Sequence, residues 1–293
     1  MGVESFVVLV VNGLSTGSIY VLIALGLTLV YGVLNIINFA HGELVMIGGI
    51  VTYVLYTQGG LSYGLSAAGG ALAAGLCGFL VERIGIRPLA THPPLSPLIS
   101  TIGISVLMSN LGLVVFGADP ALLSTGLGSA MVTVGSIRLS AQRLLIVGIT
   151  ALLVALLSLA LRHTRIGTAV RAATQDREVA GLMGINTPLL VMGTFVIGAL
   201  LAGVAGAMMG PLVMVSPLMG GAATLKGFAV VIVGGIGSVL GTVIAGVVVG
   251  LAEALTAGYL TTSYQDVVTF VFVLAVLMLR PTGLIAERLE ENV

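Results

Sequence analysis

Two long stretches without a charged side chain constrain this sequence most strongly. Residues 5–42 contain no Asp, Glu, Lys or Arg, a run of 38, and residues 44–81 form a second run of 38. A helix needs about 20 apolar residues to cross the hydrocarbon core of a bilayer. Each run therefore has room for a full crossing plus a turn or a half-helix. Over the whole chain only 8% of residues are charged, against about 25% in an ordinary soluble domain. The sequence predicts an all-α, polytopic integral membrane protein.

Nine apolar segments are expected to cross or enter the membrane, separated by clusters of Gly, Pro and polar residues. The segment at 222–236 is short and interrupted by Gly234 and Gly235, which favours a re-entrant half-helix and leaves eight or nine spans. We expect one transmembrane domain over residues 1–293. The predicted segments are 12–33, 40–57, 63–82, 98–116, 143–161, 189–210, 222–236, 239–257 and 264–280.

The basic residues predict which way the chain faces. Cytoplasmic loops of membrane proteins carry an excess of Lys and Arg, and most of the 11 basic residues here fall in three segments that alternate to one side. That side is expected to be the cytoplasm, with the C-terminus on it. Nine crossings place the N-terminus outside and eight place it inside; Arg138 and Arg143 count mildly against the scheme. The cytoplasmic arginines are Arg83, Arg87, Arg162, Arg165, Arg171, Arg177, Arg280 and Arg288.

Several activities lack their sequence requirements. A P-loop needs a Gly-rich loop ending in Gly-Lys-Ser/Thr, and the only lysine, Lys226, has no such surroundings. The stretch GGIGSVLG at 234–241 is better explained as a tight turn between helices. One cysteine and three dispersed histidines indicate no metal site, and no catalytic set or cofactor site is evident. Equal numbers of acidic and basic residues argue against nucleic-acid binding.

One long polar segment, 162–188, is expected on the cytoplasmic side and contains the signals of a short helix. Asp176 is a good N-cap, Gly184 can close the helix, and Pro188 prevents its continuation. About two turns of helix with one apolar face would be too short to be stable alone in water. Such a helix could insert into a groove on a soluble partner, or rest on lipid headgroups. Its apolar face consists of Val179, Leu182 and Met183.

Four blocks in this order resemble the permease subunits of branched-chain amino acid ABC importers. They are GLTLVYGVLNIINFAHGELVMIGG, GTAVRAATQDREVAGLMGIN, LKGFAVVIVGGIGSVLGTVIAGVVVG and LRPTGL. The resemblance implies a bacterial plasma-membrane protein that works with two cytoplasmic ATPase subunits, an extracytoplasmic binding protein and a second permease, expected to be a related chain in a heterodimer. It also implies that residues 167–186, within the expected cytoplasmic coupling loop 162–188, meet the ATPases. The coupling residues that match the family are Gly167, Arg171, Ala172, Asp176, Ala180, Gly184 and Ile185, and the apolar face of the short helix adds Val179 and Met183.

The translocation path is expected to use the few polar residues within the apolar chain. Glu43 would lie in hydrocarbon, where a carboxylate is costly and is usually paired or functional, and Lys226 is its natural opposite charge. Asn38 is a plausible N-cap for a helix that starts near Phe39. Glu253 is expected near the outer surface. The path candidates are Asn35, Asn38, His41, Glu43, Ser105, Ser109, Asn110 and Lys226.

Some alternatives remain open. Permeases similar to the resembled family carry urea, short amides or aromatic acids, so the substrate is not fixed. An ion-coupled secondary transporter, using Glu43 or Glu253, and an intramembrane enzyme are less favoured. The outer segment 117–142 is either a connector or a docking surface for an extracytoplasmic partner. Small residues repeat every four positions at 202–210 and 246–254, which predicts close helix packing inside the chain.

Overall fold

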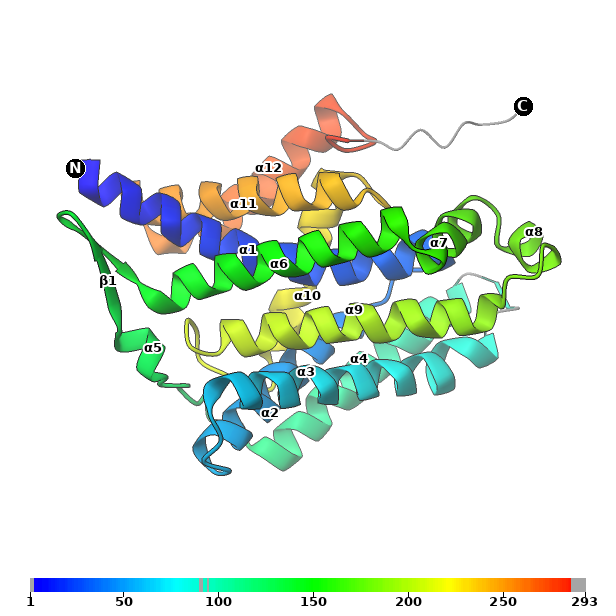
Figure 1. Ribbon diagram of the computed structural model, residues 1–293, viewed down its shortest axis with the longest axis horizontal. Coiled ribbons are helices and arrows are strands. Elements are labelled where there is room, and N and C mark those ends of the chain that lie inside the picture. The colour runs from blue at the N-terminus through cyan, green and yellow to red at the C-terminus, as the bar shows by residue number, and fades with distance from the viewer. Residues whose placement is uncertain (1–2, 90–91, 94, 286–293) are drawn as a thin grey trace.

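The computed structural model describes residues 3–89, 92–93 and 95–285, and they form a bundle of long helices along one axis (Figure 1). Seven helical segments are long and apolar enough to cross a membrane. Two shorter apolar helices accompany them, α2 (His41–Thr57) and α10 (Met219–Gly234). Each of the nine predicted segments coincides with one of these helices, so the predicted all-α, polytopic fold is confirmed. The seven segments contain α1 (Val3–Leu34), α3 (Tyr63–Leu80), α4 (Leu95–Phe116), α6 (Ala141–His163), α9 (Thr187–Met209), α11 (Val239–Tyr259) and α12 (Gln265–Leu279).

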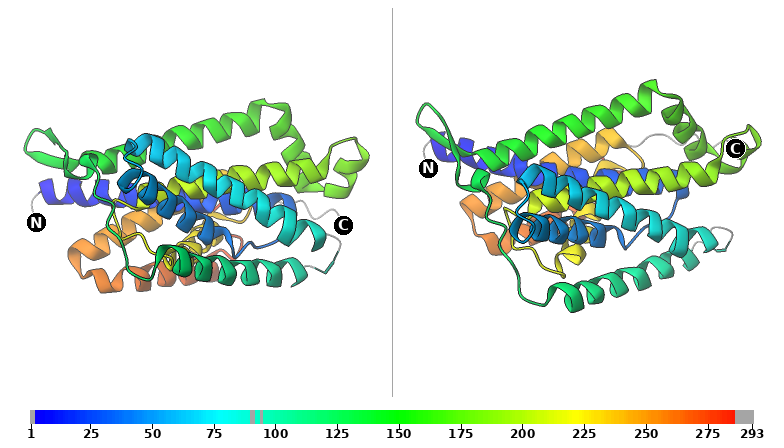
Figure 2. Two further views of the ribbon diagram at one scale, coloured as in Figure 1. Left: turned by 90° about the horizontal axis from the view of Figure 1, so that it is seen from below. Right: turned by 60° about the horizontal axis from the view of Figure 1, so that its bottom comes forward.

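The two ends of the bundle differ (Figures 1 and 2). One end holds the start of α1, the short helix α5 (Gly126–Ser129) and a hairpin of β1 (Met131–Val134) and β2 (Ile137–Ser140), paired antiparallel with Met131 opposite Ser140. The hairpin was not anticipated from the sequence. The other end holds α7 (Arg165–Gln175) and α8 (Arg177–Leu182). There α3 continues into a π-helix, Val81–Ile86, and a 3₁₀ turn, Arg87–Leu89.

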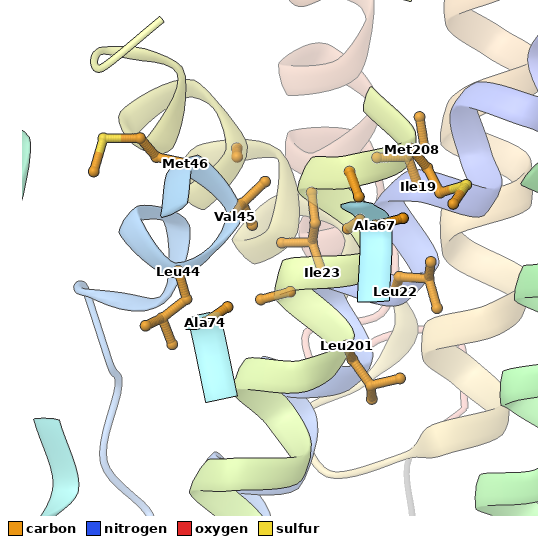
Figure 3. Close-up of a cluster of buried hydrophobic side chains, with 14 of the residues drawn as sticks. Ile19, Leu22, Ile23, Leu44, Val45, Met46, Ala67, Ala74, Leu201 and Met208 are labelled. Carbon is orange, nitrogen blue, oxygen red and sulfur yellow. The ribbon is translucent and has the colours of Figure 1, made fainter. Parts of the chain in front are cut away.

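The core lies where α1, α2, α3 and α9 meet. Figure 3 shows Ile19, Leu22 and Ile23 of α1 among the side chains of this cluster, with Val45 from α2 and Leu201 from α9. The central part of α1 is largely enclosed, whereas α4 and α6 bury little of their surface in the chain. The outer helices therefore present apolar faces to lipid or to another membrane protein.

Glycines let the central helices approach at backbone distance. A Cβ atom at Gly206 would lie 1.9 Å from the Val45 carbonyl oxygen, and one at Gly250 would lie 2.3 Å from Gly17 Cα. Such positions accept only glycine unless a helix moves. The predicted small-residue seams are thus confirmed as internal contacts, α9 against α2 and α11 against α1. The turn after α10 is also confirmed, with positive φ at Gly235 and Gly237.

Helix α2 begins at about half the depth of the bundle. The His41 ring nitrogen Nε2 lies 3.1 Å from the Ile23 carbonyl oxygen, and Ile23 is about 17 Å from the end of α1 at 1.5 Å per residue. Helix α10 starts beside it, because a Cβ atom at Gly42 would lie 2.0 Å from the Gly220 carbonyl oxygen. Both helices are about 25 Å long, shorter than the hydrocarbon core of about 30 Å. The bundle therefore contains two short helices whose N-termini meet inside it.

Candidate coupling helix and translocation path

Helix α8 is built as its sequence predicts. The Asp176 carboxylate accepts hydrogen bonds from the backbone N–H groups of Glu178 (2.8 Å) and Val179 (2.9 Å). At the other end Gly184 has φ +89°, the left-handed conformation that closes a helix. The element is six residues long, so neighbouring structure must stabilise it.

The apolar face of α8 points away from the protein. Val179, Leu182 and Met183 are 52%, 83% and 79% exposed, whereas Ala180 on the opposite face is 4% exposed. The helix thus adheres to the bundle through a small side chain. Its large apolar side chains remain free for contact with something outside the described part of the chain.

Behind α8 lies a buried apolar cluster that extends to the start of α2. Ala180 belongs to this cluster together with Val170 and Ala173 of α7, Phe195 of α9, and Ala40, which immediately precedes α2. Ile185 and Ala172, two further predicted coupling residues, pack against the same cluster. Because packed side chains transmit strain, a displacement of α8 would be felt at the N-terminus of α2.

Gly167 and Arg171 hold α7 against the end of α6. A Cβ atom at Gly167 would lie 2.1 Å from the Leu161 carbonyl oxygen, so glycine is required there. The Arg171 guanidinium donates to that same carbonyl and, at 3.3 Å, to the Thr168 hydroxyl. Both residues therefore shape the corner between α6 and α7, while the exposed apolar side chains of α8 face outward.

Glu43 lies in the first turn of α2 and is buried, 3% exposed. Its Oε1 accepts a hydrogen bond of 3.0 Å from the Ser105 hydroxyl of α4. Its Oε2 is buried without a hydrogen-bond partner among the described residues. A Cβ atom at Gly220 would lie 2.6 Å from that oxygen, so the first turn of α10 borders the carboxylate. One oxygen of the carboxylate is thus held by Ser105, and the other is enclosed and unpaired among the described residues.

The other predicted path residues divide into two groups. His41 and Asn38 are buried next to Glu43 in sequence, at 1% and 2% exposed. Ser109 bonds to the Ser105 carbonyl at 2.7 Å, and the exposed Asn110 bonds to the Val106 carbonyl at 2.7 Å. Asn35 is exposed at the end of α1 with φ +52°. The structure therefore places Asn38, His41, Glu43 and Ser105 around the start of α2, with Ser109 one turn further along α4, whereas Asn35 and Asn110 are exposed.

The predicted helix start at Phe39 is wrong by two residues. Helix α2 begins at His41 and its N-cap position is Ala40, with no side-chain cap. The Asn38 Oδ1 instead accepts from the Ala40 N–H at 3.0 Å. Asn38 therefore shapes the turn before the helix.

The expected pairing of Glu43 with Lys226 is also wrong. Lys226 forms salt bridges with Glu253 and, at 2.7 Å, with Asp266. Glu253 was expected near the surface but is 4% exposed. It also accepts hydrogen bonds from the hydroxyls of Tyr20, at 2.6 Å, and Thr269. This network joins α1, α10, α11 and α12, and it satisfies the lysine without Glu43.

Sequence reasoning missed Glu82. It lies in the π-helix after α3, is 1% exposed, and has Arg83, Arg87 and Arg177 as its charged neighbours. Its Oε2 is buried without a hydrogen-bond partner among the described residues. The only signal in the sequence was an acidic residue next to an arginine at the end of a span; the π-helical turn, a feature that often marks functional positions, is visible only in the structure.

Buried polar groups inside a helical membrane bundle commonly mark substrate pathways, so the bundle with its buried Glu43 has the features of a membrane transport protein. The chain belongs to the family described as branched-chain amino acid transport system / permease component, whose profile matches residues 9–277. This is a family of transport permeases and not of enzymes.

Named relatives support the assignment over nearly the full length. The chain is 37% identical to the high-affinity branched-chain amino acid transport system permease protein LivH of Escherichia coli K12, covering 96% of each chain. It is 38% identical to LivH of Salmonella typhimurium, again over 96% of each. It is 36% identical to BraD of Pseudomonas aeruginosa, over 97% of this chain and 96% of that one. No solved structure matches significantly.

Proposed function

We propose that this chain is the transmembrane permease subunit of an ATP-driven importer that moves branched-chain or other hydrophobic amino acids across the bacterial plasma membrane. The observation that carries the proposal is the similarity to LivH and BraD over almost the whole chain. Two cytoplasmic ATPase subunits supply the energy, a second related permease completes the membrane part, and an extracytoplasmic binding protein delivers the substrate.

The end of the bundle with α7 and α8 faces the cytoplasm in this proposal. It holds Arg162, Arg165, Arg171 and Arg177, in keeping with the positive-inside rule. The start of α1 and the β1–β2 hairpin then face the outside, and the exit of α12 at Arg280 returns to the cytoplasm. Arg288, the other C-terminal arginine used for orientation, lies outside the described residues.

Helix α8 is the docking element for the ATPases. Its exposed Val179, Leu182 and Met183 form an apolar face that a groove on a soluble partner would bury. In a lipid-resting helix the same face would lie along the headgroup boundary. We favour docking because Ala180 joins α8 to the buried cluster that includes Ala40, so a partner's movement would reach α2.

Glu43 lines the path and receives the ammonium group of the substrate. The Glu43 Oε2, which is enclosed beside the first turn of α10 without a hydrogen-bond partner among the described residues, would become accessible when the path opens. The backbone N–H groups of a helix N-terminus favour an anion, so this turn provides a complementary position for the substrate carboxylate. The substrate is a zwitterion, so the water around its two charges would be replaced by the Glu43 carboxylate at one end and by backbone N–H groups of α10 at the other.

The docking step is tested with Met183→Asp, which places a charge in the middle of the exposed apolar face. We expect the ATPases to detach and substrate-stimulated ATP hydrolysis to be lost, because a buried unpaired charge costs several kcal/mol, on the order of 3–5. The measurement is co-purification of the ATPases with an affinity-tagged permease. Met183→Leu keeps the apolar face and should behave as wild type. ATPase recovery at wild-type yield with Met183→Asp would show that α8 is not the docking element.

A further inference from the structure

A cavity opens at the α7 end of the bundle, between α6 and α11 and behind α7. Its volume is about 410 Å³, within the range of about 300–1,000 Å³ of small-ligand sites. Residues of α1, including Thr28 and Leu29, form its floor. We call it the α6–α11 cavity. It is separate from Glu43, which does not line it, and from the exposed face of α8.

The charged residues that line the α6–α11 cavity are all basic among the described residues. Arg162, in the last turn of α6, and Arg171 line it, and none of the described lining residues is acidic. Ser158, Thr174 and Ser238 add hydroxyl groups. The Arg171 guanidinium is held by the Leu161 carbonyl and the Thr168 hydroxyl, whereas no side-chain contact ties down the exposed Arg162 among the described residues. The polar part of the cavity suits a phosphate group.

The remaining wall is apolar and extends along the helices toward the middle of the membrane. Val154 and Leu161 of α6 face Leu240 and Val243 of α11 across the cavity. Leu240 is 56% exposed, so this wall is continuous with the outer apolar surface of α11. A soluble phosphate would leave these side chains uncovered, but an acyl chain would cover them.

We propose that the α6–α11 cavity binds an anionic phospholipid of the cytoplasmic leaflet, with its phosphate at Arg162 and Arg171 and an acyl chain between Val154 and Leu240. Basic pockets between transmembrane helices on the cytoplasmic side are suited to such headgroups. The bound lipid would fill the space between α6, α7 and α11, and so brace the corner from which α7 and α8 project. The choice of the cytoplasmic leaflet rests on the proposed orientation, but the inference does not depend on the substrate or on the docking of ATPases at α8.

The test is a titration of the purified full-length protein, in neutral detergent, with short-chain phosphatidylglycerol, counting bound lipids by native mass spectrometry. We expect one saturable site per chain that short-chain phosphatidylcholine does not fill. Arg162→Gln should weaken binding about five- to tenfold, as expected for loss of one basic group at a lipid headgroup. Arg165→Gln is the matched control. It removes the same charge three residues from Arg162, but the Arg165 side chain does not line the cavity.

Two further measurements separate a lipid from free phosphate. Val154→Trp fills the apolar wall without changing the charge and should also weaken phosphatidylglycerol binding. Excess inorganic phosphate should leave the bound lipid in place. The proposal is overturned if Arg162→Gln binds phosphatidylglycerol as wild type does or if Arg165→Gln weakens binding equally. It is also overturned if inorganic phosphate displaces the bound lipid.

Discussion

Glu43→Gln is the substitution that examines the translocation path most closely. The amide has the shape of the carboxylate and can still accept the hydrogen bond from Ser105 through Oε1. The substitution replaces the second oxygen, Oε2, by an NH2 group, which carries no charge and donates hydrogen bonds. That oxygen is buried beside Gly220 and has no hydrogen-bond partner among the described residues. The substitution therefore removes the group proposed to meet the substrate ammonium and leaves the packing in place.

The expected effect follows from the strength of one charged hydrogen bond. Hydrogen bonds to charged groups contribute about 1.5–3 kcal/mol, and about 1.4 kcal/mol corresponds to a factor of ten. Uptake of radiolabelled leucine should fall roughly ten- to hundredfold in proteoliposomes that contain the assembled transporter. The ATPases should still co-purify, because the substitution leaves the exposed apolar face of α8 unchanged. Glu4→Gln, which removes an exposed carboxylate near the N-terminus, should transport as wild type.

Wild-type uptake by Glu43→Gln, at equal expression, would refute this role. Glu43 would then be a polar group at the start of α2 and no more. The path would have to be sought along the α4 face that carries Ser105 and Ser109.

Two other predictions concern stability and orientation. Lys226→Met leaves Glu253 buried without its cation and should lower the free energy of unfolding by about 3–5 kcal/mol. Adding Glu253→Gln should restore part of that loss in thermal unfolding; equal losses in the single and double variants would contradict a buried ion pair. In a background without Cys77, a cysteine at exposed Gln175 should react with an impermeant thiol reagent only after the membrane is opened, and one at exposed Ser124 should react in intact cells. The reverse pattern would invert the proposed orientation.

The spans could be predicted because their signal is local. Charge-free stretches such as 5–42 must lie in lipid or in a core, and Gly and Pro clusters separate them. Helix α8 was predictable for the same reason, since Asp176 and Gly184 act within a few residues of their own positions. Hydropathy also detected that α10 is short, but not that its first turn meets that of α2.

The polar contacts could not be predicted, because they depend on how helices face one another. Glu253 is 27 residues from Lys226 in sequence, and charge alone made Glu43 an equally good partner. Helix α7 was missed because its buried residues, Gly167, Val170 and Ala173, are small and give a weak apolar signal, although they recur every third position. Glu82 was missed because its burial arises from the π-helical end of α3, which the sequence does not reveal.

The most direct test of the central claim is the energy source of transport. The permease is co-reconstituted with its ATPase subunits, a second permease and a substrate-loaded binding protein in proteoliposomes, and leucine uptake is followed with ATP supplied to the ATPases. We predict uptake that requires ATP, persists when ionophores collapse all ion gradients, and disappears with Met183→Asp in the permease. Uptake that follows an imposed ion gradient without ATP, and stops when an ionophore is added, would contradict the account.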